Sequence, residues 1–262
     1  MIKELIQKIK EKKPLHRLDD PFVEEHIIKY FILNPNIKKR LEATTPAHLE
    51  KSKHFKATVK AVRKELNRVY GTFWEEGTTF SSHQSTRERS TIYPTLYKRI
   101  FTITGTPRSI LDLGCGLNPL SYPSMNFKGM YTATELTSKD CELLQNIFEQ
   151  QGIKGKVVRV NLLKETALPR ADMCFLFKIL DVLDSKNHKL SERILKSLNC
   201  TWIIVSFSTT TLRHRRMNVP RRGWFEHMLN RLQWKYHTLT FENEIFYLIR
   251  RQSSHSTDST TG

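Results

Sequence analysis

Ser109-Ile-Leu-Asp-Leu-Gly-Cys-Gly-Leu-Asn-Pro-Leu120 is the stretch that decides the fold of this chain. Its apolar run, Ile110 to Leu113, has the length of a buried β-strand and leads directly into Gly114-Cys115-Gly116. Glycines at such a point allow a tight turn and let the backbone approach a bound ligand closely. A bare G-x-G after a strand is often an ordinary turn, so the neighbouring sequence has to decide between the two interpretations.

The spacing of these glycines indicates which ligand would fit. The third glycine of the dinucleotide fingerprint G-x-G-x-x-G is missing, and no Lys-Ser/Thr pair follows to hold a triphosphate and its magnesium ion. The pattern therefore suits S-adenosylmethionine better than NAD or ATP.

The composition points to a polyanionic partner. The 262 residues allow one large domain, or a catalytic domain with a small accessory one. They include 43 Lys and Arg against 26 Asp and Glu, a formal net charge of +17. Such a balance favours nucleic acid, with a membrane surface as the competing partner. The chain has no apolar stretch of membrane-spanning length, and its N-terminus is amphipathic and charged rather than a signal peptide. We therefore expect a cytoplasmic protein that does not bind membranes.

The four cysteines argue against a metal site or a disulfide framework. Cys115, Cys141, Cys174 and Cys200 are far apart and form no C-x-x-C pair or Cys/His cluster with zinc spacing. We expect no bound metal, and we interpret Cys115 as a small residue that fits a tight turn.

Residues 1–75 are predicted to form a helical subdomain with one basic face. Helix-start signals occur at Asp20-Pro21 and Thr45-Pro46. After the second signal, apolar residues recur at helical spacing from Phe55 to Val69, and a stripe of cations lies beside them. These cations are Lys53, Lys56, Lys60, Lys64 and Arg68. A charge run is usually a solvated helix face, but only Glu65 offsets this one, which favours contact with RNA phosphates over pairing within the helix.

Segment 76–108 is predicted to link this subdomain to the first strand and to carry a helix that caps the cofactor. That helix would open within His83-Gln-Ser-Thr-Arg-Glu-Arg89 and run on through residue 100. Unpaired backbone N–H groups at its start, together with Arg87 and Arg89, would make an anion site suited to a carboxylate. Alternatively, these arginines pair with Glu88 or other nearby acids.

Residues 109–250 alternate between strand-like and helix-like segments. Expected strands are 110–113, 130–134, 156–160, 172–177 and 203–207, with helices between them such as 139–151 and 191–198. Two extended runs, 235–241 and 244–249, would close the sheet as a hairpin. We predict an α/β fold with a seven-stranded, mostly parallel sheet, as in Rossmann-like class I methyltransferases, and a ligand at the switch point beside the first strand. Residues 251–262, rich in Ser and Thr, are predicted to be a disordered tail.

Three polar residues at predicted strand ends can serve such a ligand. Glu135 ends the second strand, where a carboxylate can accept hydrogen bonds from both hydroxyls of a ribose. Asn161 follows the third strand and can offer its side-chain carbonyl to an adenine amino group, with Leu162 and Leu163 as apolar walls. Lys178 closes the fourth strand, where it would position the target, contact RNA, cap the site or simply end the strand in solvent.

Two absences narrow the reaction. No Asp/Asn-Pro-Pro-Tyr/Phe motif, the arrangement used on exocyclic amines, follows the fourth strand, and no cysteine lies at that end to attack a pyrimidine ring. A ring nitrogen with a free lone pair, such as guanine N7, carries no proton at neutral pH and needs no general base. Alignment of that nitrogen with the methyl donor, and tolerance of the positive product, would supply most of the rate.

A second basic stretch follows the fifth strand. Five arginines and a histidine lie between residues 213 and 222 without an acid, and aromatic residues follow at 224 and 225. A loop of this kind suits an RNA backbone and base stacking better than solvent. The predicted RNA-binding residues outside the helical subdomain are His83, Arg213, Arg215, Arg216, Arg221 and Arg222.

Together these motifs resemble the aminoglycoside-resistance methyltransferases that modify N7 of a guanine in the decoding site of 16S ribosomal RNA. The resemblance spans about residues 50–250, and its most specific elements are Ser85-Thr-Arg-Glu-Arg89 and Leu111-Asp-Leu-Gly-Cys-Gly-Leu-Asn-Pro-Leu120. It implies S-adenosylmethionine as cofactor, with the two arginines at the methionine carboxylate, Glu135 at the ribose and Asn161 at the adenine. It also implies that the helical subdomain docks on 16S rRNA in the 30S subunit.

The full set of predicted cofactor-binding residues is Arg87, Arg89, Asp112, Gly114, Cys115, Gly116, Asn118, Pro119, Glu135, Leu136, Asn161, Leu162 and Lys178. This chain also departs from the family pattern. The family usually has aspartate at the positions of Glu135 and Asn161, proline at those of Asp181 and Ser208, and a glycine-containing loop in place of the arginine cluster.

These departures leave two alternatives open. One is an RNA methyltransferase of the same fold that acts on another rRNA or tRNA atom, such as a ribose 2′-hydroxyl. The other is a non-catalytic ribosome-binding protein. In each case we expect a monomer.

Overall fold

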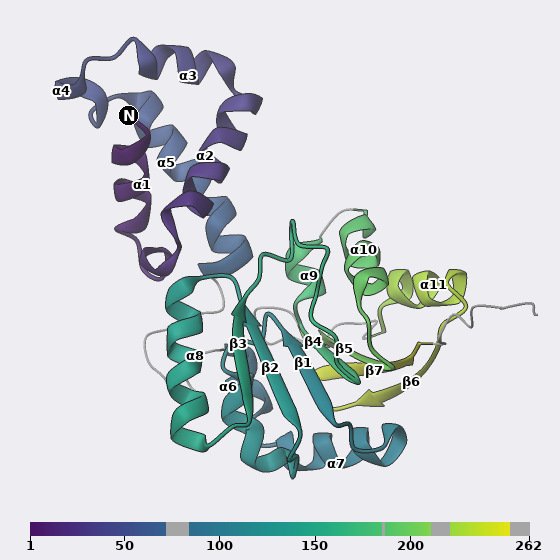
Figure 1. The fold of residues 1–262 in the computed structure, drawn as a ribbon. Helices are drawn as coiled ribbons and strands as arrows, with labels where there is room; N and C mark the ends of the chain where they lie inside the picture. Colours follow the sequence, from purple (N-terminus) through teal and green to yellow (C-terminus); the bar gives the residue numbers. More distant parts are fainter. Residues whose placement is uncertain (72–83, 185–186, 211–220, 252–262) are drawn as a thin grey trace, which may run out of the picture.

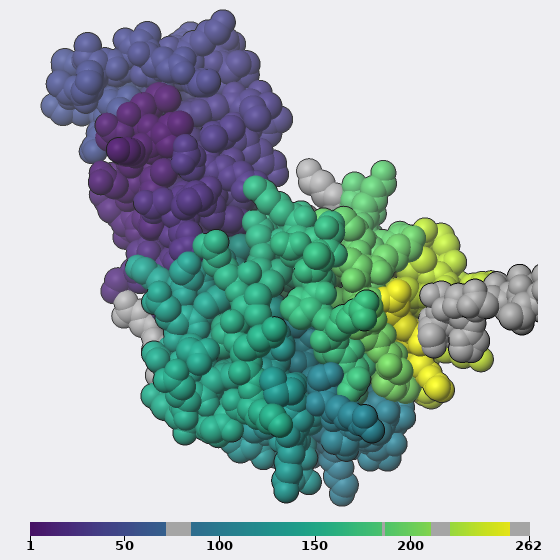
Figure 2. All heavy atoms as spheres, in the orientation of Figure 1, coloured from purple at the N-terminus to yellow at the C-terminus, as the bar shows by residue number. Residues whose placement is uncertain are grey.

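The computed structural model describes residues 1–71, 84–184, 187–210 and 221–251, which form an N-terminal helical lobe and a larger α/β lobe (Figures 1 and 2). The helices of the first lobe are α1 (Ile2–Lys10), α2 (Asp20–Leu33), α3 (Pro35–Glu42), α4 (Pro46–Leu49) and α5 (Lys53–Leu66). A 3-10 turn, η1 (Leu15–Arg17), precedes α2, and a π-helical turn, η2 (Asn67–Gly71), continues α5.

The apolar stripe of α5 builds the core of the helical lobe. Phe55, Val62 and Leu66 are buried on this helix, and α1 and α2 pack against it. The start of this helix differs from the prediction, because Thr45-Pro46 begins only the four-residue α4. The long helix begins at residue 53, where the Oγ of Ser52 accepts a hydrogen bond from the backbone N–H of His54 at 3.2 Å and so caps the new helix.

The α/β lobe contains the predicted seven-stranded sheet. Its strands are β1 (Ser109–Leu113), β2 (Met130–Glu135), β3 (Gly155–Arg159), β4 (Met173–Phe177), β5 (Trp202–Ser208), β6 (Lys235–Thr240) and β7 (Glu244–Arg250). Their order is β3-β2-β1-β4-β5-β7-β6. The first five strands pair in parallel, and the β6–β7 hairpin adds two antiparallel strands beside β5. The predicted fold class is therefore confirmed.

Helices cover both faces of the sheet. They are α6 (Gln84–Arg89), α7 (Tyr93–Thr104), α8 (Ser138–Gln151), α9 (Leu180–Leu183), α10 (Lys189–Ser197) and α11 (Gly223–Arg231), with a 3-10 helix, η4 (Asn118–Met125), after the glycine turn. Side chains alternate along each strand, so that Ile110 and Phe175 face the core under α7 and α8, whereas Leu111 and Leu176 face the core under α10 and α11.

The prediction of a single helix from residue 83 through residue 100 is wrong. The structure has two helices, α6 and α7, separated by a turn at 90–92. Pro94 stands at the second position of α7. A proline without an N–H is tolerated in the first turn of a helix but breaks a helix interior, so a new helix begins just before it.

The helical lobe stands at the end of the sheet where the parallel strands finish (Figure 1). Arg17 and Tyr70 of this lobe both contact Asp140, in the first turn of α8. Predictions for the linker at 76–83, for residues 211–220 and for the tail at 252–262 lie outside the described residues. Within the described ranges, no helix is both long and apolar enough to cross a membrane.

Candidate active site

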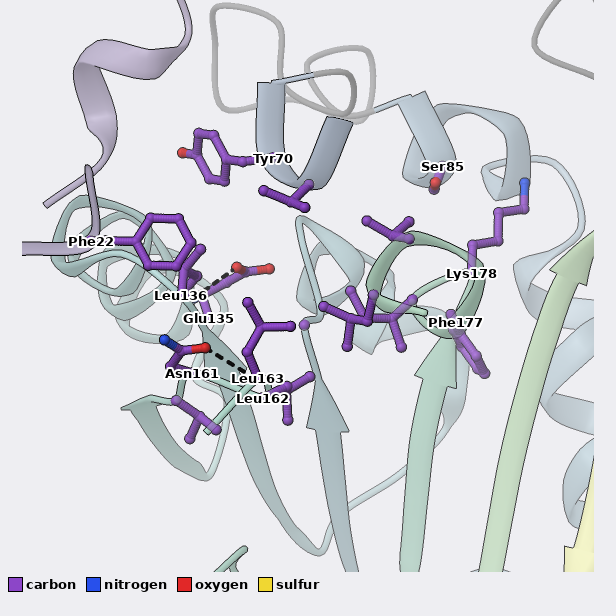
Figure 3. Close-up of a pocket in the computed structure, with 16 residues that line it drawn as sticks. Phe22, Tyr70, Ser85, Glu135, Leu136, Asn161, Leu162, Leu163, Phe177 and Lys178 are labelled. Atoms are coloured by element: carbon purple, nitrogen blue, oxygen red, sulfur yellow. Dashed lines mark hydrogen bonds between the residues drawn. The ribbon is translucent and has the colours of Figure 1, made fainter. Parts of the chain in front are cut away.

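A pocket lies at the carboxyl ends of the parallel strands (Figure 3). The strand order reverses between β1 and β4, which is where ligands bind in open α/β sheets. Six predicted cofactor residues line this pocket, namely Gly114, Glu135, Leu136, Asn161, Leu162 and Lys178. The sequence therefore predicted the place of the pocket and part of its lining.

The turn after β1 needs its glycines. Gly114 and Gly116 have φ values of +59° and +54°, a region that residues with a Cβ rarely adopt. A Cβ on Gly114 would also lie 3.0 Å from Cδ1 of Ile179. The turn is held by the neighbouring strand, because the backbone N–H of Cys115 donates to the carbonyl oxygen of Thr134 at 3.1 Å. Cys115 itself is buried in the turn.

Glu135 is a buried carboxyl group at the end of β2, with only 8% of its surface exposed. One carboxyl oxygen accepts a hydrogen bond from the backbone N–H of Gly116 at 2.6 Å, and the other accepts one from Leu136 at 3.0 Å. Burial, and next the negative charge of Asp140, raise the pKa of Glu135 to about 8, although the two backbone hydrogen bonds oppose this shift. Each oxygen keeps a further lone pair that can accept a hydroxyl group of a ligand.

Asn161 lies two residues beyond β3 and shapes the loop that follows. Its Oδ1 accepts a hydrogen bond from the backbone N–H of Leu163 at 3.0 Å. A carbonyl oxygen has two lone pairs, so this atom can still accept an amino group. Val160 and Leu162, both buried, provide apolar surface beside it.

Several predicted cofactor residues lie behind the glycine turn, not on the pocket wall. The amide of Asn118 joins them, because its Nδ2 donates to Asp112 at 2.8 Å and its Oδ1 accepts from Arg89 at 3.0 Å and from Tyr93 at 2.8 Å. Burial raises the pKa of Asp112 to about 6, against the hydrogen bonds from Tyr131 and Asn118. Pro119 follows in η4 and is also buried. These residues hold the glycine turn in place from the side away from the pocket. Their direct contact with a cofactor stays a prediction.

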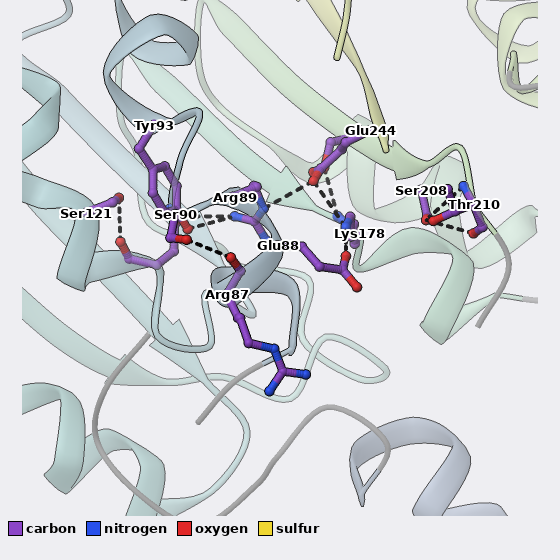
Figure 4. A network of polar contacts seen from close by, with 12 residues as sticks. Arg87, Glu88, Arg89, Ser90, Tyr93, Ser121, Lys178, Ser208, Thr210 and Glu244 are labelled. Atoms are coloured by element: carbon purple, nitrogen blue, oxygen red, sulfur yellow. Dashed lines mark hydrogen bonds and ion pairs between the residues drawn. The ribbon is translucent and has the colours of Figure 1, made fainter. Parts of the chain in front are cut away.

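Lys178 lines the pocket and belongs to a partly buried ion cluster (Figure 4). Its Nζ lies 2.5 Å from Glu88 of α6 and 3.2 Å from Glu244 of β7, and Glu244 also pairs with Arg89 at 3.3 Å. Lys178 has a φ of +57°, an unusual backbone conformation for a lysine. The alternative that Lys178 ends the strand in solvent is therefore wrong.

The two arginines of the Ser-Thr-Arg-Glu-Arg motif differ in their placement. Arg89 is 2% exposed, and its guanidinium faces Glu244 and Asn118, as the alternative of pairing with nearby acids required. Arg87 is exposed and points away from the ion cluster in Figure 4. The contact of either arginine with a carboxylate remains a prediction.

Nine further residues line the pocket without having been predicted to do so, and four of them come from segments before the glycine turn. These four are Phe22 of α2, Val69 and Tyr70 of η2, and Ser85 of α6. The first three come from the helical lobe, more than 40 residues before the glycine turn. Their apolar spacing indicated only a helix core.

The predicted basic stripe lies on the exposed side of α5. Lys53, Lys56, Lys60 and Lys64 are exposed there. A groove between α5 and α1 is lined by one acid, Glu50, and by the cations Lys8, Lys12, Lys51, Lys56, Lys60, Arg63, Lys64 and Arg68. Glu11, outside the lining, pairs with Lys8 and Arg63. Arg68 also lines this groove, and its contact with RNA stays a prediction. Its guanidinium pairs with Glu65 at 2.8 Å within the same turn and donates to the carbonyl oxygen of Val182 at 3.0 Å, because the π-helical turn directs it toward the other lobe.

The described part of the arginine cluster is also engaged within the protein. Arg221 pairs with Glu226 at 2.6 Å. Arg222 pairs with Asp181 at 2.9 Å and donates to the carbonyl oxygen of Ser208 at 2.9 Å. The sequence suggested no acid for these arginines, because Asp181 is far away in the chain and Glu226 lies just beyond the arginine-rich run. His83, Arg213, Arg215 and Arg216 lie outside the described residues.

The sheet order, the pocket beside β1 and the carboxyl group at the end of β2 define the class of Rossmann-like methyltransferases. Within this class, the family described as ribosomal RNA methyltransferase (FmrO) matches residues 75–248. The chain belongs to this family.

Five relatives in sequence share the name 16S rRNA (guanine(1405)-N(7))-methyltransferase. That of Frankia casuarinae is 29% identical over 175 residues, which cover 64% of this chain and 61% of the relative. That of Serratia marcescens is 25% identical over 240 residues, which cover 85% of this chain and 94% of the relative. The chain thus spans less than two thirds of the length of the Frankia relative.

Solved structures agree in fold. The 16S rRNA methylase RmtB superposes with a TM-score of 0.72 at 22% identity, over 96% of this chain and 99% of that chain. The 16S rRNA methylase ArmA gives a TM-score of 0.56 at 25% identity, over 66% and 89%. The agreement with RmtB includes the helical lobe, since it covers nearly the whole chain.

Proposed function

We propose that this protein is an S-adenosylmethionine-dependent methyltransferase that modifies N7 of a guanine in the decoding region of 16S rRNA. The observation that carries the proposal is the pocket beside β1, lined by Glu135 and Asn161, in a chain of the ribosomal RNA methyltransferase family. The names of its relatives support the substrate.

The residues at the pocket fit this cofactor. Glu135 offers carboxyl lone pairs to the two ribose hydroxyls, and Asn161 offers a carbonyl oxygen to the adenine amino group. Gly114 lines the pocket without a side chain, and a Cβ there would crowd Ile179, another lining residue.

The cofactor, when bound, supplies an electrophilic methyl group on sulfur, and guanine N7 supplies the lone pair that forms the new bond, while the electrons of the broken bond stay on sulfur. N7 carries no proton at neutral pH, so the chain needs no general base. What remains for its side chains is to align the two reactants and to tolerate the positive charge that develops on the base.

The ion cluster beside the pocket suits a cationic product. Lys178 and Arg89 are balanced by Glu88 and Glu244, so the charges of these four groups sum to zero. An uncompensated lysine at this place would repel a methylated guanine. We assign Lys178 to target positioning, with its charge neutralised by the two carboxylates.

RNA recognition is assigned to the basic surfaces. The groove between α1 and α5 gathers cations around one acid and would follow a phosphate backbone. We assign residues 1–75 to docking on the 30S subunit, 76–108 to a linker and cofactor cap, 109–250 to catalysis, and 251–262 to a tail. One chain carries both the pocket beside β1 and the basic groove between α1 and α5. We therefore propose a monomer that works on ribosomes in the cytoplasm.

The test is incubation of the purified protein with methyl-labelled S-adenosylmethionine and 30S subunits, followed by mapping of the label in the RNA. We expect label on N7 of one guanine of 16S rRNA, and none with the variant Glu135→Ala. Label on another atom would favour the alternative acceptor. Ribosome binding without any methyl transfer would favour a non-catalytic binding protein.

A further inference from the structure

The pocket has one wall that does not come from the α/β lobe. Phe22, Val69 and Tyr70 of the helical lobe line it together with residues at the ends of β2 and β3. In Figure 3, Phe22 lies on the side of Leu136 and Asn161, whereas Lys178 lies on the opposite side. Phe22 therefore flanks the part of the pocket assigned to the base, away from the part assigned to methyl transfer.

A buried joint holds this wall in place. Asp140 is fully buried in the first turn of α8, and one of its oxygens accepts two hydrogen bonds from Arg17, from Nε at 2.7 Å and from Nη2 at 2.5 Å. Its other oxygen accepts from the hydroxyl groups of Tyr70 at 2.6 Å and of Thr137 at 2.7 Å. A buried carboxylate requires such partners, so the joint constrains how the two lobes meet.

In the sequence, Asp140 of the joint lies close to Glu135, the residue assigned to the ribose. Asp140 comes five residues after Glu135, and Tyr70 both joins Asp140 and lines the pocket. Arg17 lies five residues before Phe22, just ahead of α2. One connected set of residues therefore runs from the lobe interface to the pocket wall.

We propose that the helical lobe completes the cofactor site: Phe22 forms the wall against which the adenine base packs, and Arg17 with Asp140 positions that wall. This inference rests on the proposed function. Phe22 is a binding residue because it would touch the base, and its ring offers an apolar face of the kind on which bases stack. Arg17 is a positioning residue, because it acts through Asp140 and does not line the pocket.

The first test measures binding of S-adenosylhomocysteine to the full chain by calorimetry. The variant Phe22→Ala should weaken binding about tenfold, in line with the stacking of one base on an aromatic ring. The control is Phe31→Ala, which removes another buried ring of α2 that does not line the pocket. Phe31→Ala should leave the Kd within about twofold of the wild-type value.

A second ligand locates the effect on the base. 5′-Methylthioadenosine has the adenine and the ribose but no amino acid, so Phe22→Ala should weaken its binding by the same factor as for S-adenosylhomocysteine. A loss for S-adenosylhomocysteine alone would place Phe22 at the amino-acid end and overturn the assignment to the base.

The joint is tested with charge variants at the same interface. Arg17→Met should weaken S-adenosylhomocysteine several-fold, and Arg17→Lys, which keeps the charge, should recover most of the affinity. The control is Glu25→Gln, which breaks the exposed ion pair with Lys164 across the two lobes and should change nothing. Thermal melting of each variant shows whether it is folded at the temperature of the titration, and if Arg17→Met is not, Arg17→Lys decides this arm.

These binding measurements distinguish a failure of the proposed function from a failure of the role assigned to Phe22. If the wild-type chain does not bind S-adenosylhomocysteine, the proposed function fails and this inference fails with it. If the wild-type chain binds and Phe22→Ala binds equally well, only the inference fails. Equal losses in Phe22→Ala and Phe31→Ala would indicate general loosening of α2 and would also overturn it.

Discussion

The buried carboxyl group of Glu135 predicts that cofactor binding depends on pH. Its pKa is raised to about 8 by burial and next by the charge of Asp140, and Asp112 adds to the shift. Without a ligand, Glu135 is therefore mostly protonated at neutral pH. A carboxylate accepts two ribose hydroxyls better than a protonated acid does, so S-adenosylhomocysteine should bind more tightly as Glu135 loses its proton.

The size of the effect follows from the pKa. With a value of about 8, roughly one Glu135 in ten is ionised at pH 7. If only the ionised form binds well, the apparent Kd at pH 7 is about tenfold weaker than well above pH 8, and each further unit of acidity weakens it about tenfold again. Binding at pH 7 should then release about 0.9 proton per site.

Calorimetry measures both quantities. S-adenosylhomocysteine is titrated into the protein between about pH 6 and pH 9, in buffers with different ionisation enthalpies, so that the number of released protons is obtained directly. The control is Glu135→Gln, which keeps the shape of the side chain and cannot ionise. Because the amino group of the ligand titrates in both experiments, only the difference between the two proteins reports on Glu135.

Two results would refute this reasoning. One is a wild-type Kd that changes with pH no more than that of Glu135→Gln. The other is binding at pH 7 without proton release, which would mean that Glu135 is already ionised in the free protein.

The same titration affects folding. The folded state holds the proton of Glu135 more tightly than the unfolded chain, whose glutamate pKa is about 4.5. The stabilisation is fully present below that unfolded pKa and is lost as the pH rises through about 8. The Tm of the ligand-free protein should therefore fall between about pH 6 and pH 9, and it should fall less in Glu135→Gln.

Three further changes have defined outcomes. Gly114→Ala forces a side chain into a positive φ and should lower the free energy of unfolding, measured in urea, by about 1–3 kcal/mol while weakening S-adenosylhomocysteine. Glu244→Gln removes a carboxylate next to the buried Arg89 and should cost about 3 kcal/mol in the same assay; no loss would mean that the cluster tolerates an uncompensated cation. Lys56→Glu with Lys60→Glu should reduce the salt dependence of binding to 30S subunits by about two units of slope, without changing the Kd for S-adenosylhomocysteine.

The fold could be predicted because its signals are local. Apolar runs at β1 and β4 are bounded by turn residues, and the stretch before β7 ends in a polar hairpin turn. The positions of Glu135 and Asn161 in the pocket wall could be predicted for the same reason, since each residue comes at or just after the end of its own strand. Helix boundaries were less accurate, because Thr45-Pro46 fits a helix start but only Ser52 provides the hydrogen bond that caps α5.

The ion cluster could not be predicted, because it depends on strand pairing. Glu244 lies opposite Ser208 in the antiparallel pair of β5 and β7, and the backbone N–H of Lys178 donates to the carbonyl oxygen of Ser206 on the same strand β5. These contacts bring Lys178 and Glu244 together across 66 positions of sequence. The spacing of charged residues along the sequence does not predict that Lys178 and Glu244 pair.

The contacts of Arg222 explain two positions at which this chain departs from the family pattern. Asp181 and Ser208 stand where the related methyltransferases were expected to have proline, and both hold Arg222, one through a carboxylate and the other through its carbonyl oxygen. Proline at the first position would remove the carboxylate, so the arginine and the acid depend on each other. We interpret the three residues as one unit that anchors the chain after β5 near the ends of the strands.

The helical lobe connects the two binding activities of the protein. Its groove between α1 and α5 carries the cations assigned to RNA, and Phe22 and Tyr70 of the same lobe line the cofactor pocket. If docking on RNA shifts this lobe, the shift must change the affinity for the cofactor, and the cofactor must change the affinity for RNA by the same factor, because binding free energies are reciprocal. The buried joint at Asp140 is one contact through which that coupling would pass, and Arg68 with Val182 and Asp19 with Ser138 also join the two lobes. The ion pair between Glu25 and Lys164 at the same interface is exposed and contributes little.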